Sequence, residues 1–346
     1  MDNPQSVHRE SFSRRPVFNA YLGNNPKCEM IPWMHADNGT TDYGESYPSL
    51  VVSIENIPQT GAWNLTASIL DFDDRELISF NSDVLLIERC IEKIWHLESP
   101  LMNPSRVNLS IKKDAVCFDE TVSLHQYHLS GKVTNFAGNP VKSIVHAIGL
   151  EGVATMTDEE GMYNLWLPSV HIRALQAYDA GYGKTSLECW IYDYFPKEDL
   201  KLDLRIGELE IYELRAWRGF LGVKMDFLPM SLSCVLSALT DKGISGRYSP
   251  ELILEDIKVI LDGTEVPLLS VDKRKEMLSG NESIDQRDEY SLHISDRELP
   301  PGGMGNLQVL QIVLQHTYEK ADLIEHGEGF FLGLRNRVSI NGGKDF

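Results

Sequence analysis

Two histidines, His125 and His128, form the closest pair of imidazoles in the chain. On a helix a spacing of three residues brings both rings to one face, where they could bind a metal ion. The surrounding residues SLHQYHLSG alternate as in an extended strand, where positions three apart point to opposite faces. We therefore expect no metal and no cofactor, and this pair is the weak metal candidate that remains.

The densest acidic cluster contains Asp71, Asp73, Asp74 and Glu76. A calcium loop needs oxygen ligands at alternate positions and a turn that glycine assists. No glycine lies within this segment, so we expect an exposed turn.

Aromatic side chains beside polar ones form two groups that could bind a sugar, because sugar sites combine aromatic surfaces with hydrogen-bonding groups. One group surrounds the polar loop HADNGTTDYGESY and the other lies in AYDAGYGKTSLECWIYDY. The candidate ligand-binding residues are Trp33, His35, Asp37, Tyr43, Tyr47, Tyr178 and Tyr182. Both groups also fit a hydrophobic core, and that alternative stays open.

Motifs for nucleophilic catalysis and phosphate binding are absent from the sequence. Neither G-x-S-x-G, G-x-x-x-x-G-K-[ST] nor G-x-G-x-x-G occurs. Cys189 lies next to Trp190 in an apolar run, where we expect a buried and unreactive thiol. No catalytic residue is predicted.

The chain has 346 residues and a formal net charge of −19, from 32 basic and 51 acidic side chains. This charge repels phosphate backbones, so we expect no nucleic-acid partner. No apolar run approaches the roughly 20 residues that span a bilayer, and the polar N-terminus lacks the apolar core of a secretory signal. The five cysteines are scattered and include no CxxC pair. We expect reduced thiols and a cytoplasmic protein without a membrane partner.

Short runs of alternating apolar and polar residues recur along the chain, separated by turn-forming residues. This pattern predicts an all-β, multi-domain fold of Ig-like or transthyretin-like β-sandwiches, with at most one or two short helices. The predicted parts are a disordered tail (1–15), an N-terminal β-sandwich domain (16–126), a middle β-sandwich (127–206) and a C-terminal β-sandwich domain (207–346).

Four segments need separate predictions. Residues 84–96 fit either a helix or a pair of strands, because their apolar spacing is mixed. Asp262-Gly263 predicts a hairpin turn. The charged segment 270–288 is expected to be a long loop, and residues 307–316 a central strand because both of their faces are partly apolar.

Residues 129–168 resemble the carboxypeptidase regulatory-like, transthyretin-like β-sandwich. Its pattern is G-x-V, a turn, G-x-P-V, and later T-D-x-x-G-x-Y ahead of a proline. The matching residues are Gly131, Val133, Gly138, Pro140, Val141, Thr157, Asp158, Gly161, Tyr163 and Pro168. The resemblance implies a fold and not an activity, since such modules accompany many functions.

Two further resemblances concern function. The string EDIKVILDGTEVP (255–267) resembles the β-subunit module of bacterial C-glycoside deglycosidases, which implies a metal-bearing partner chain. The transthyretin-like fold also occurs in intradiol dioxygenases, which hold iron with two Tyr and two His. Tyr163 and His171 are the nearest equivalents here, and Arg173 stands where a second histidine would complete H-x-H.

Together these patterns favour a non-catalytic accessory or binding subunit that acts with a protein partner, or as a homo-oligomer, in carbohydrate or glycoside metabolism. A carbohydrate is the expected ligand. One alternative is a β-type subunit of a C-glycoside deglycosidase complex, a carbon–carbon lyase whose metal and catalytic groups lie on the partner. The other is an intradiol-dioxygenase-like metalloenzyme.

Overall fold

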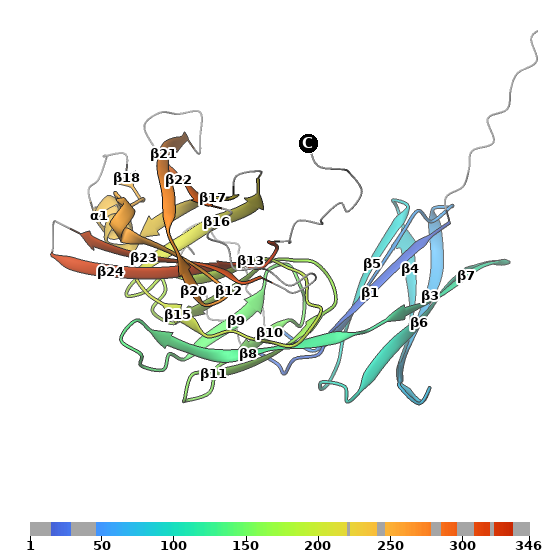
Figure 1. Ribbon diagram of the computed structural model, residues 1–346. Coiled ribbons are helices and arrows are strands. Elements are labelled where there is room, and N and C mark those ends of the chain that lie inside the picture. The colour runs from blue at the N-terminus through green and yellow to red at the C-terminus, as the bar shows by residue number, and fades with distance from the viewer. Residues whose placement is uncertain are drawn as a thin grey trace, which may run out of the picture. The chain divides into compact units, whose positions relative to one another are not determined.

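The computed structural model describes residues 15–28, 46–219, 222–240, 246–277, 285–295, 308–318 and 322–334. Strands dominate these residues (Figure 1), and the helical segments among them are α1 (Leu232–Thr240) and the short 3-10 turn η2 (Leu254–Asp256). The predicted all-β fold class is confirmed. No helix in the described part of the chain is long and apolar enough to cross a membrane.

The chain divides into two compact units. The N-terminal unit comprises Met1–Asn24 and Tyr47–His125, and the C-terminal unit comprises Asn25–Ser46 and Gln126–Phe346. The predicted boundary near residue 126 lies close to this division, whereas that near residue 206 falls inside the C-terminal unit. The three-part division itself stays a prediction.

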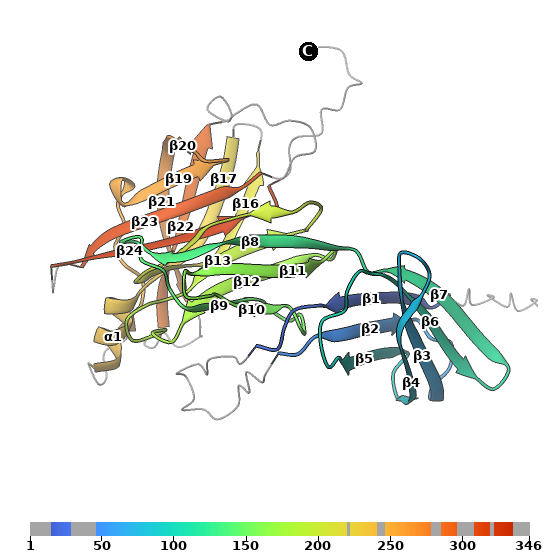
Figure 2. The same cartoon turned by 90° about the horizontal axis from the view of Figure 1, so that it is seen from below.

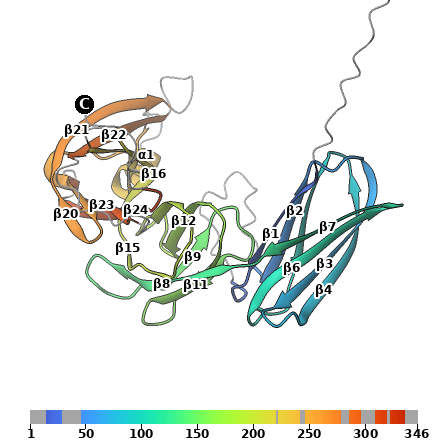
Figure 3. The same cartoon turned by 45° about the vertical axis from the view of Figure 1, so that its right-hand side comes forward.

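From residue 15 onward, the N-terminal unit is a sandwich of two antiparallel sheets (Figure 3). One sheet has the order β1 (Val17–Gly23), β2 (Ser49–Glu55) and β5 (Cys90–His96). The other has the order β4 (Glu76–Leu86), β3 (Gly61–Asp71), β6 (Pro104–Lys113) and β7 (Val116–Ser123). Of the two alternatives for residues 84–96, the structure has the strand pair: the end of β4 and β5.

Strand β3 shows why these residues form a sandwich. Its alternate side chains Trp63, Leu65, Ala67 and Ile69 are buried, at 2% exposure or less, in one core cluster with Val107, Leu109 and Ile111 of β6. The residues between them are polar and face outward. This period of two fixes which face of the four-stranded sheet meets solvent.

The described residues of the C-terminal unit form three sheets (Figure 2). Its largest sheet has eight strands in the order β10 (Ala154–Met156), β9 (Ser143–Ala147), β12 (Ile172–Asp179), β13 (Cys189–Tyr194), β24 (Leu323–Phe331), β23 (Leu310–Tyr318), β19 (Ile257–Leu261) and β20 (Thr264–Val266). A second sheet consists of β11 (Met162–Pro168), β8 (Gln126–Asn135), β14 (Leu200–Lys201) and β15 (Leu204–Ile206). The third consists of β16 (Leu209–Arg218), β17 (Gly222–Ser231), β22 (Asp285–Ser295), β18 (Gly246–Arg247) and β21 (Leu268–Met277).

One parallel pairing joins the middle and C-terminal regions of the chain. Strand β13 pairs with β24, and Ile191 lies opposite Phe330. The eight-stranded sheet therefore includes strands from both sides of residue 206, and Arg205 forms an ion pair with buried Glu328 across the same division (2.5 Å). This shared sheet is the physical reason why the two regions form one compact unit.

The charged segment 270–288 corrects the sequence prediction. It was expected to be a loop, but its described residues belong to β21 and β22, which pair from Ser270 opposite His293 onward. Among the described residues, strand β21 pairs only with β22, so it lies at an edge, where charged side chains protect against aggregation. The predictions of a hairpin turn at Asp262-Gly263 and of a central strand near 307–316 are confirmed by β19–β20 and β23.

The residues of the regulatory-like pattern mostly have structural roles. Asp158 Oδ1 accepts hydrogen bonds from the backbone N–H groups of Glu160 and Met162, which shapes the turn before β11. Gly161 has a φ of 78°, which favours glycine. The buried hydroxyl of Tyr163 donates to the Leu202 carbonyl at 2.7 Å.

Candidate functional site

The predicted sugar-binding residues do not form one described site. Trp33, His35, Asp37 and Tyr43 lie outside the described residues. Tyr47 is partly buried, and its ring centroid lies 5.4 Å from that of His96. No shared surface of this group can therefore be described.

Tyr178 and Tyr182 are interior residues, with exposed fractions of 2% and 9%. They belong to a core cluster that includes Cys28, Ile144 and Leu187. Neither ring offers an exposed surface to a sugar, because both side chains are packed in the core. Of the two alternatives, a sugar site and a hydrophobic core, the structure has the core. The buried thiol of Cys189 also matches its prediction, and burial raises its pKa.

The residues considered as metal ligands contact groups other than a shared metal site. His125 precedes β8 and His128 lies on it, where its ring packs 5.0 Å from that of Trp166. Tyr163 donates its hydroxyl to a carbonyl, and His171 is bound to Asp193 at 2.6 Å. Within the described ranges no group of three or more His, Cys, Asp and Glu could hold a metal ion. The dioxygenase-like ligand set is therefore not assembled by these residues.

A polar surface lies on the outer face of the four-stranded sheet in the N-terminal unit. Its side chains are the outward-facing members of each strand's alternation, because the inward-facing members form the core. We call this surface the polar sheet face, and it consists of Ser79, Asn81 and Asp83 of β4, Asn64, Thr66 and Ser68 of β3, Asn108, Ser110 and Lys112 of β6, and Cys117, Asp119 and Thr121 of β7.

Strand register arranges these twelve side chains in three rows across the sheet. The middle row runs from Asn81 through Thr66 and Ser110 to Asp119, each opposite the next. The outer rows are Asp83, Asn64, Lys112 and Cys117, and Ser79, Ser68, Asn108 and Thr121. Neighbouring members of a row lie about 5 Å apart, since this is the distance between paired strands.

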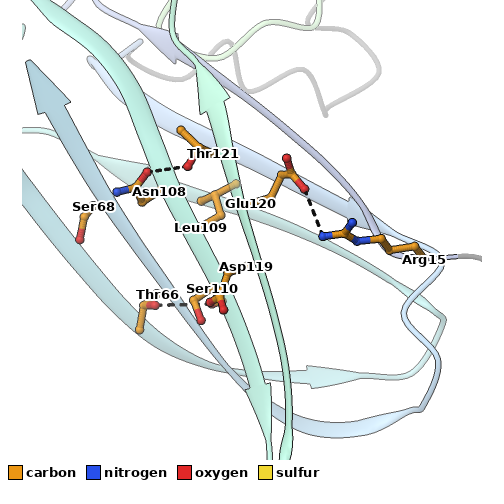
Figure 4. A pocket seen from close by; sticks show the side chains of 9 residues that line it. All are labelled: Arg15, Thr66, Ser68, Asn108, Leu109, Ser110, Asp119, Glu120 and Thr121. Atoms are coloured by element: carbon orange, nitrogen blue, oxygen red, sulfur yellow. Dashed lines mark hydrogen bonds and ion pairs between the residues drawn. The ribbon is translucent and has the colours of Figure 1, made fainter. Parts of the chain in front are cut away.

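Hydrogen bonds between neighbouring strands orient several of these groups. Asn64 Nδ2 donates to Asn81 Oδ1 at 2.7 Å and to Asp83 Oδ1 at 3.0 Å. Thr121 Oγ1 donates to Asn108 Oδ1 at 2.9 Å (Figure 4). Because each amide and hydroxyl has further donor or acceptor capacity, the face can still bind a ligand that carries hydroxyl groups.

A shallow cavity of about 570 Å³ lies over the β3, β6 and β7 part of this face (Figure 4). Its lining residues are Arg15, Thr66, Ser68, Asn108, Leu109, Ser110, Asp119, Glu120 and Thr121. Arg15 and Glu120 are an exposed ion pair at 3.9 Å. The cavity is thus lined almost wholly by groups that form hydrogen bonds.

Asp119 is the acidic member of the polar sheet face that lines the cavity. Hydrogen bonding to Ser110, and then to Cys117, lowers the pKa of this carboxyl group. The residue therefore stays a carboxylate at neutral pH and accepts hydrogen bonds only. It lacks the raised pKa that suits a general acid.

Part of the polar sheet face was visible in the sequence, but the alternation there was used only to predict a strand. The run WNLTASIL (63–70) predicted a strand by its alternation, and its polar members Asn64, Thr66 and Ser68 are the β3 part of the face. The contributions of β4, β6 and β7 depend on register between segments distant in sequence. Local pattern does not determine that register.

Comparisons with known proteins give no family. Neither a family model nor a curated relative matches the chain. Among solved structures it is similar to a candidate carbohydrate binding protein from Bacteroides uniformis (10% identity, TM-score 0.23, 58% of this chain and 95% of that one). It is also similar to a DUF3823 family protein from Parabacteroides merdae (13% identity, TM-score 0.20, 60% of this chain and 98% of that one). Similarities with these TM-scores establish neither the fold nor the function of this chain.

Proposed function

We propose that this chain is a non-catalytic carbohydrate-binding protein and that the polar sheet face holds the carbohydrate. The observation that carries the proposal is the arrangement of hydroxyl, amide and carboxylate groups in three aligned rows on one sheet. Sugar hydroxyl groups both donate and accept hydrogen bonds, as do the Ser, Thr and Asn side chains of these rows. An open face of this kind suits an extended neutral chain better than an enclosed small molecule.

The positions of the carboxylates support binding without hydrolysis. The two acidic residues of the face, Asp83 and Asp119, belong to the opposite edge strands β4 and β7. Three strand spacings separate these strands, about 14 Å in all. Glycoside hydrolysis uses two carboxyl groups roughly 5–9.5 Å apart. Glu120, the other carboxylate that lines the cavity, is paired with Arg15, and the pKa of Asp119 is lowered, so neither is placed as a general acid. We therefore expect the chain to bind sugar without releasing reducing ends.

Affinity electrophoresis and calorimetry with the full chain test this proposal. Xylan, mixed-linkage β-glucan and a soluble mannan serve as neutral polysaccharide probes. Thr66→Val keeps side-chain shape and β-propensity but removes a hydroxyl inside the cavity, and Asn108→Ala removes an amide beside it. Each variant should weaken binding about three- to tenfold, as for the loss of a neutral hydrogen bond. Thr155→Val, on β10 in the C-terminal unit, is the matched control.

Two results would contradict the proposal. One is the absence of binding to all three polysaccharides, and the other is equal binding by the Thr66 variant, the Asn108 variant and the control. Release of oligosaccharides by the purified chain would contradict its non-catalytic part.

We further propose that the chain acts beside a protein partner in carbohydrate or glycoside metabolism, as its regulatory-like region suggests. A second candidate, the β-type subunit of a C-glycoside deglycosidase complex, is supported by the β19–β20 hairpin at the resembling string. Mixing with a separately purified metal-bearing α-type chain tests it by size-exclusion chromatography. Failure to form a complex at micromolar concentration would reject this candidate.

A further inference from the structure

A second cavity lies in the C-terminal unit and has a volume of about 320 Å³. It is bounded by β12, β13, β16 and the end of β24, and its lining residues are Arg173, Tyr192, Asp193, Glu213, Leu214, Arg215, Ala216 and Phe331. Cavities that bind small ligands begin at about this size. The proposed carbohydrate face belongs to the other unit, so this cavity needs its own explanation.

A β-bulge forms one wall of the cavity. The register of β16 with β17 shifts between Tyr212 and Arg215, and Glu213 within the bulge has a φ of 49°. Tyr192 holds the bulge: its hydroxyl accepts from the Glu213 N–H at 3.0 Å and donates to the Ile211 carbonyl at 3.2 Å. The wall is therefore preformed, although it requires an unfavourable backbone conformation.

Asp193 also lines the cavity and also has a positive φ (55°). Its Oδ1 is 2.6 Å from His171 Nε2. Its carboxylate packs so closely on Gly333 that a side chain at that position would overlap it. Two non-glycine residues in left-handed conformations thus line one cavity, which is a pattern typical of functional sites.

Of the charged groups that line the cavity, the guanidinium of Arg173 has no ion-pair partner among the described residues. Asp193 is paired with His171, and Glu213 is paired with Arg215 at 2.5 Å. In the part of the chain that the structure describes, Arg173 forms no ion pair and no side-chain hydrogen bond. Leu214, Ala216 and Phe331 supply an apolar lining, and Leu214 and Phe331 are almost fully buried. Arg173 is exposed, so its guanidinium is accessible to a ligand in the cavity.

We propose that this cavity binds a small molecule with one carboxylate and a compact apolar body. The guanidinium of Arg173 binds the carboxylate, because its planar fork of N–H donors matches the two oxygens. The apolar body lies against Leu214, Ala216 and Phe331. This site is independent of the proposed carbohydrate binding, which uses other residues in the other unit.

Calorimetric titration of the full chain with benzoate tests the proposal. Benzamide has almost the same shape without the charge, and glucuronate has the charge with a polar body. We expect benzoate to bind, and benzamide and glucuronate to bind at least tenfold more weakly. Arg173→Gln should weaken benzoate binding about tenfold or more, as for the loss of a charged hydrogen-bond partner. Arg75→Gln, an exposed arginine of the N-terminal unit, is the control and should bind like the native chain.

A second variant tests the position of the ligand independently of charge. Ala216→Leu places added apolar volume in the cavity and should abolish benzoate binding while leaving polysaccharide binding unchanged. The proposal is overturned if benzoate fails to bind at tens of millimolar, if benzamide binds equally well, if glucuronate binds more tightly, or if either variant binds benzoate like the native chain.

Discussion

Replacing Glu188 by glutamine tests the most unusual electrostatic feature of the core. Glu188 and Glu210 are both buried, with exposed fractions of 1% and 0%. Trp190 Nε1 donates to Glu210 Oε1 at 2.5 Å. Both oxygens of Glu188 and Oε2 of Glu210 lack a hydrogen-bond partner among the described residues. Two carboxylates cannot both be charged in such surroundings without a large cost.

Protonation relieves this cost. Burial, followed by the proximity of Glu210, raises the pKa of Glu188 to about 11. Burial raises the pKa of Glu210 to about 7. Glu188 is therefore a neutral carboxylic acid at neutral pH in the folded protein, whereas in the unfolded chain it is a carboxylate. Glutamine has nearly the same shape as glutamate and is uncharged at every pH, so its burial does not require the binding of a proton.

The sign and size of the effect follow from proton linkage. Since the folded pKa of Glu188 is raised, the folded state binds more protons, and its stability falls as pH rises above the unfolded value. Between an unfolded pKa near 4.5 and pH 7 the penalty grows by about 1.4 kcal/mol per pH unit, to about 3 kcal/mol. Glu188→Gln should therefore leave stability unchanged near pH 4 and raise it by about 3 kcal/mol at pH 7.

Urea unfolding at pH 4, 5, 6 and 7, followed by tryptophan fluorescence, measures this difference, because Trp190 contacts the pair. Glu160→Gln is the matched control, since that glutamate is exposed in the same unit. A Glu188→Gln variant that is no more stable than the native chain at pH 7, or whose added stability does not grow with pH, would show that the folded protein does not hold Glu188 protonated.

Three further substitutions in the C-terminal unit should lower the free energy of unfolding measured with urea. Arg205→Gln leaves the carboxylate of Glu328 buried without its charged partner and should cost about 3 kcal/mol; a cost below about 1 kcal/mol would mean that Glu328 is already neutral. Tyr163→Phe removes the buried hydroxyl that donates to the Leu202 carbonyl and should cost about 1–2 kcal/mol, so an unchanged midpoint would contradict that bond. Gly161→Ala adds a Cβ at a φ of 78° and should cost at least about 1 kcal/mol, a prediction that a stabilised variant would overturn.

Local alternation predicted the strands well where one face is buried and the other is polar. The run 63–70 belongs to a strand for that reason. Residues 310–316 belong to β23, a central strand that the apolar residues on both of its faces predicted. Alternation gave no decision for 84–96, where a strand, a turn and a second strand together imitate helical spacing. It failed for 270–277, because an edge strand that pairs on one side only can carry charges on most of its residues.

The local sequence patterns could not predict contacts between segments that are distant in the chain. The parallel pairing of β13 with β24 joins residues more than a hundred positions apart, and nothing in either strand specifies its neighbour. The aromatic residues Tyr178 and Tyr182 illustrate the same difficulty. Their types fit a sugar platform and a core equally well, and only the packing around them decides.

The side chains of the polar sheet face support the proposal that it is a binding surface. Eleven of its twelve residues are Ser, Thr, Asn, Asp or Cys, with at most two rotatable side-chain bonds, and Lys112 is the exception. Immobilising such short groups costs little conformational entropy, whereas long side chains lose much more. Solvation alone would be served equally well by lysine and glutamate, which are common elsewhere in this chain. Short groups in fixed rows are useful when a second molecule must meet many of them at once.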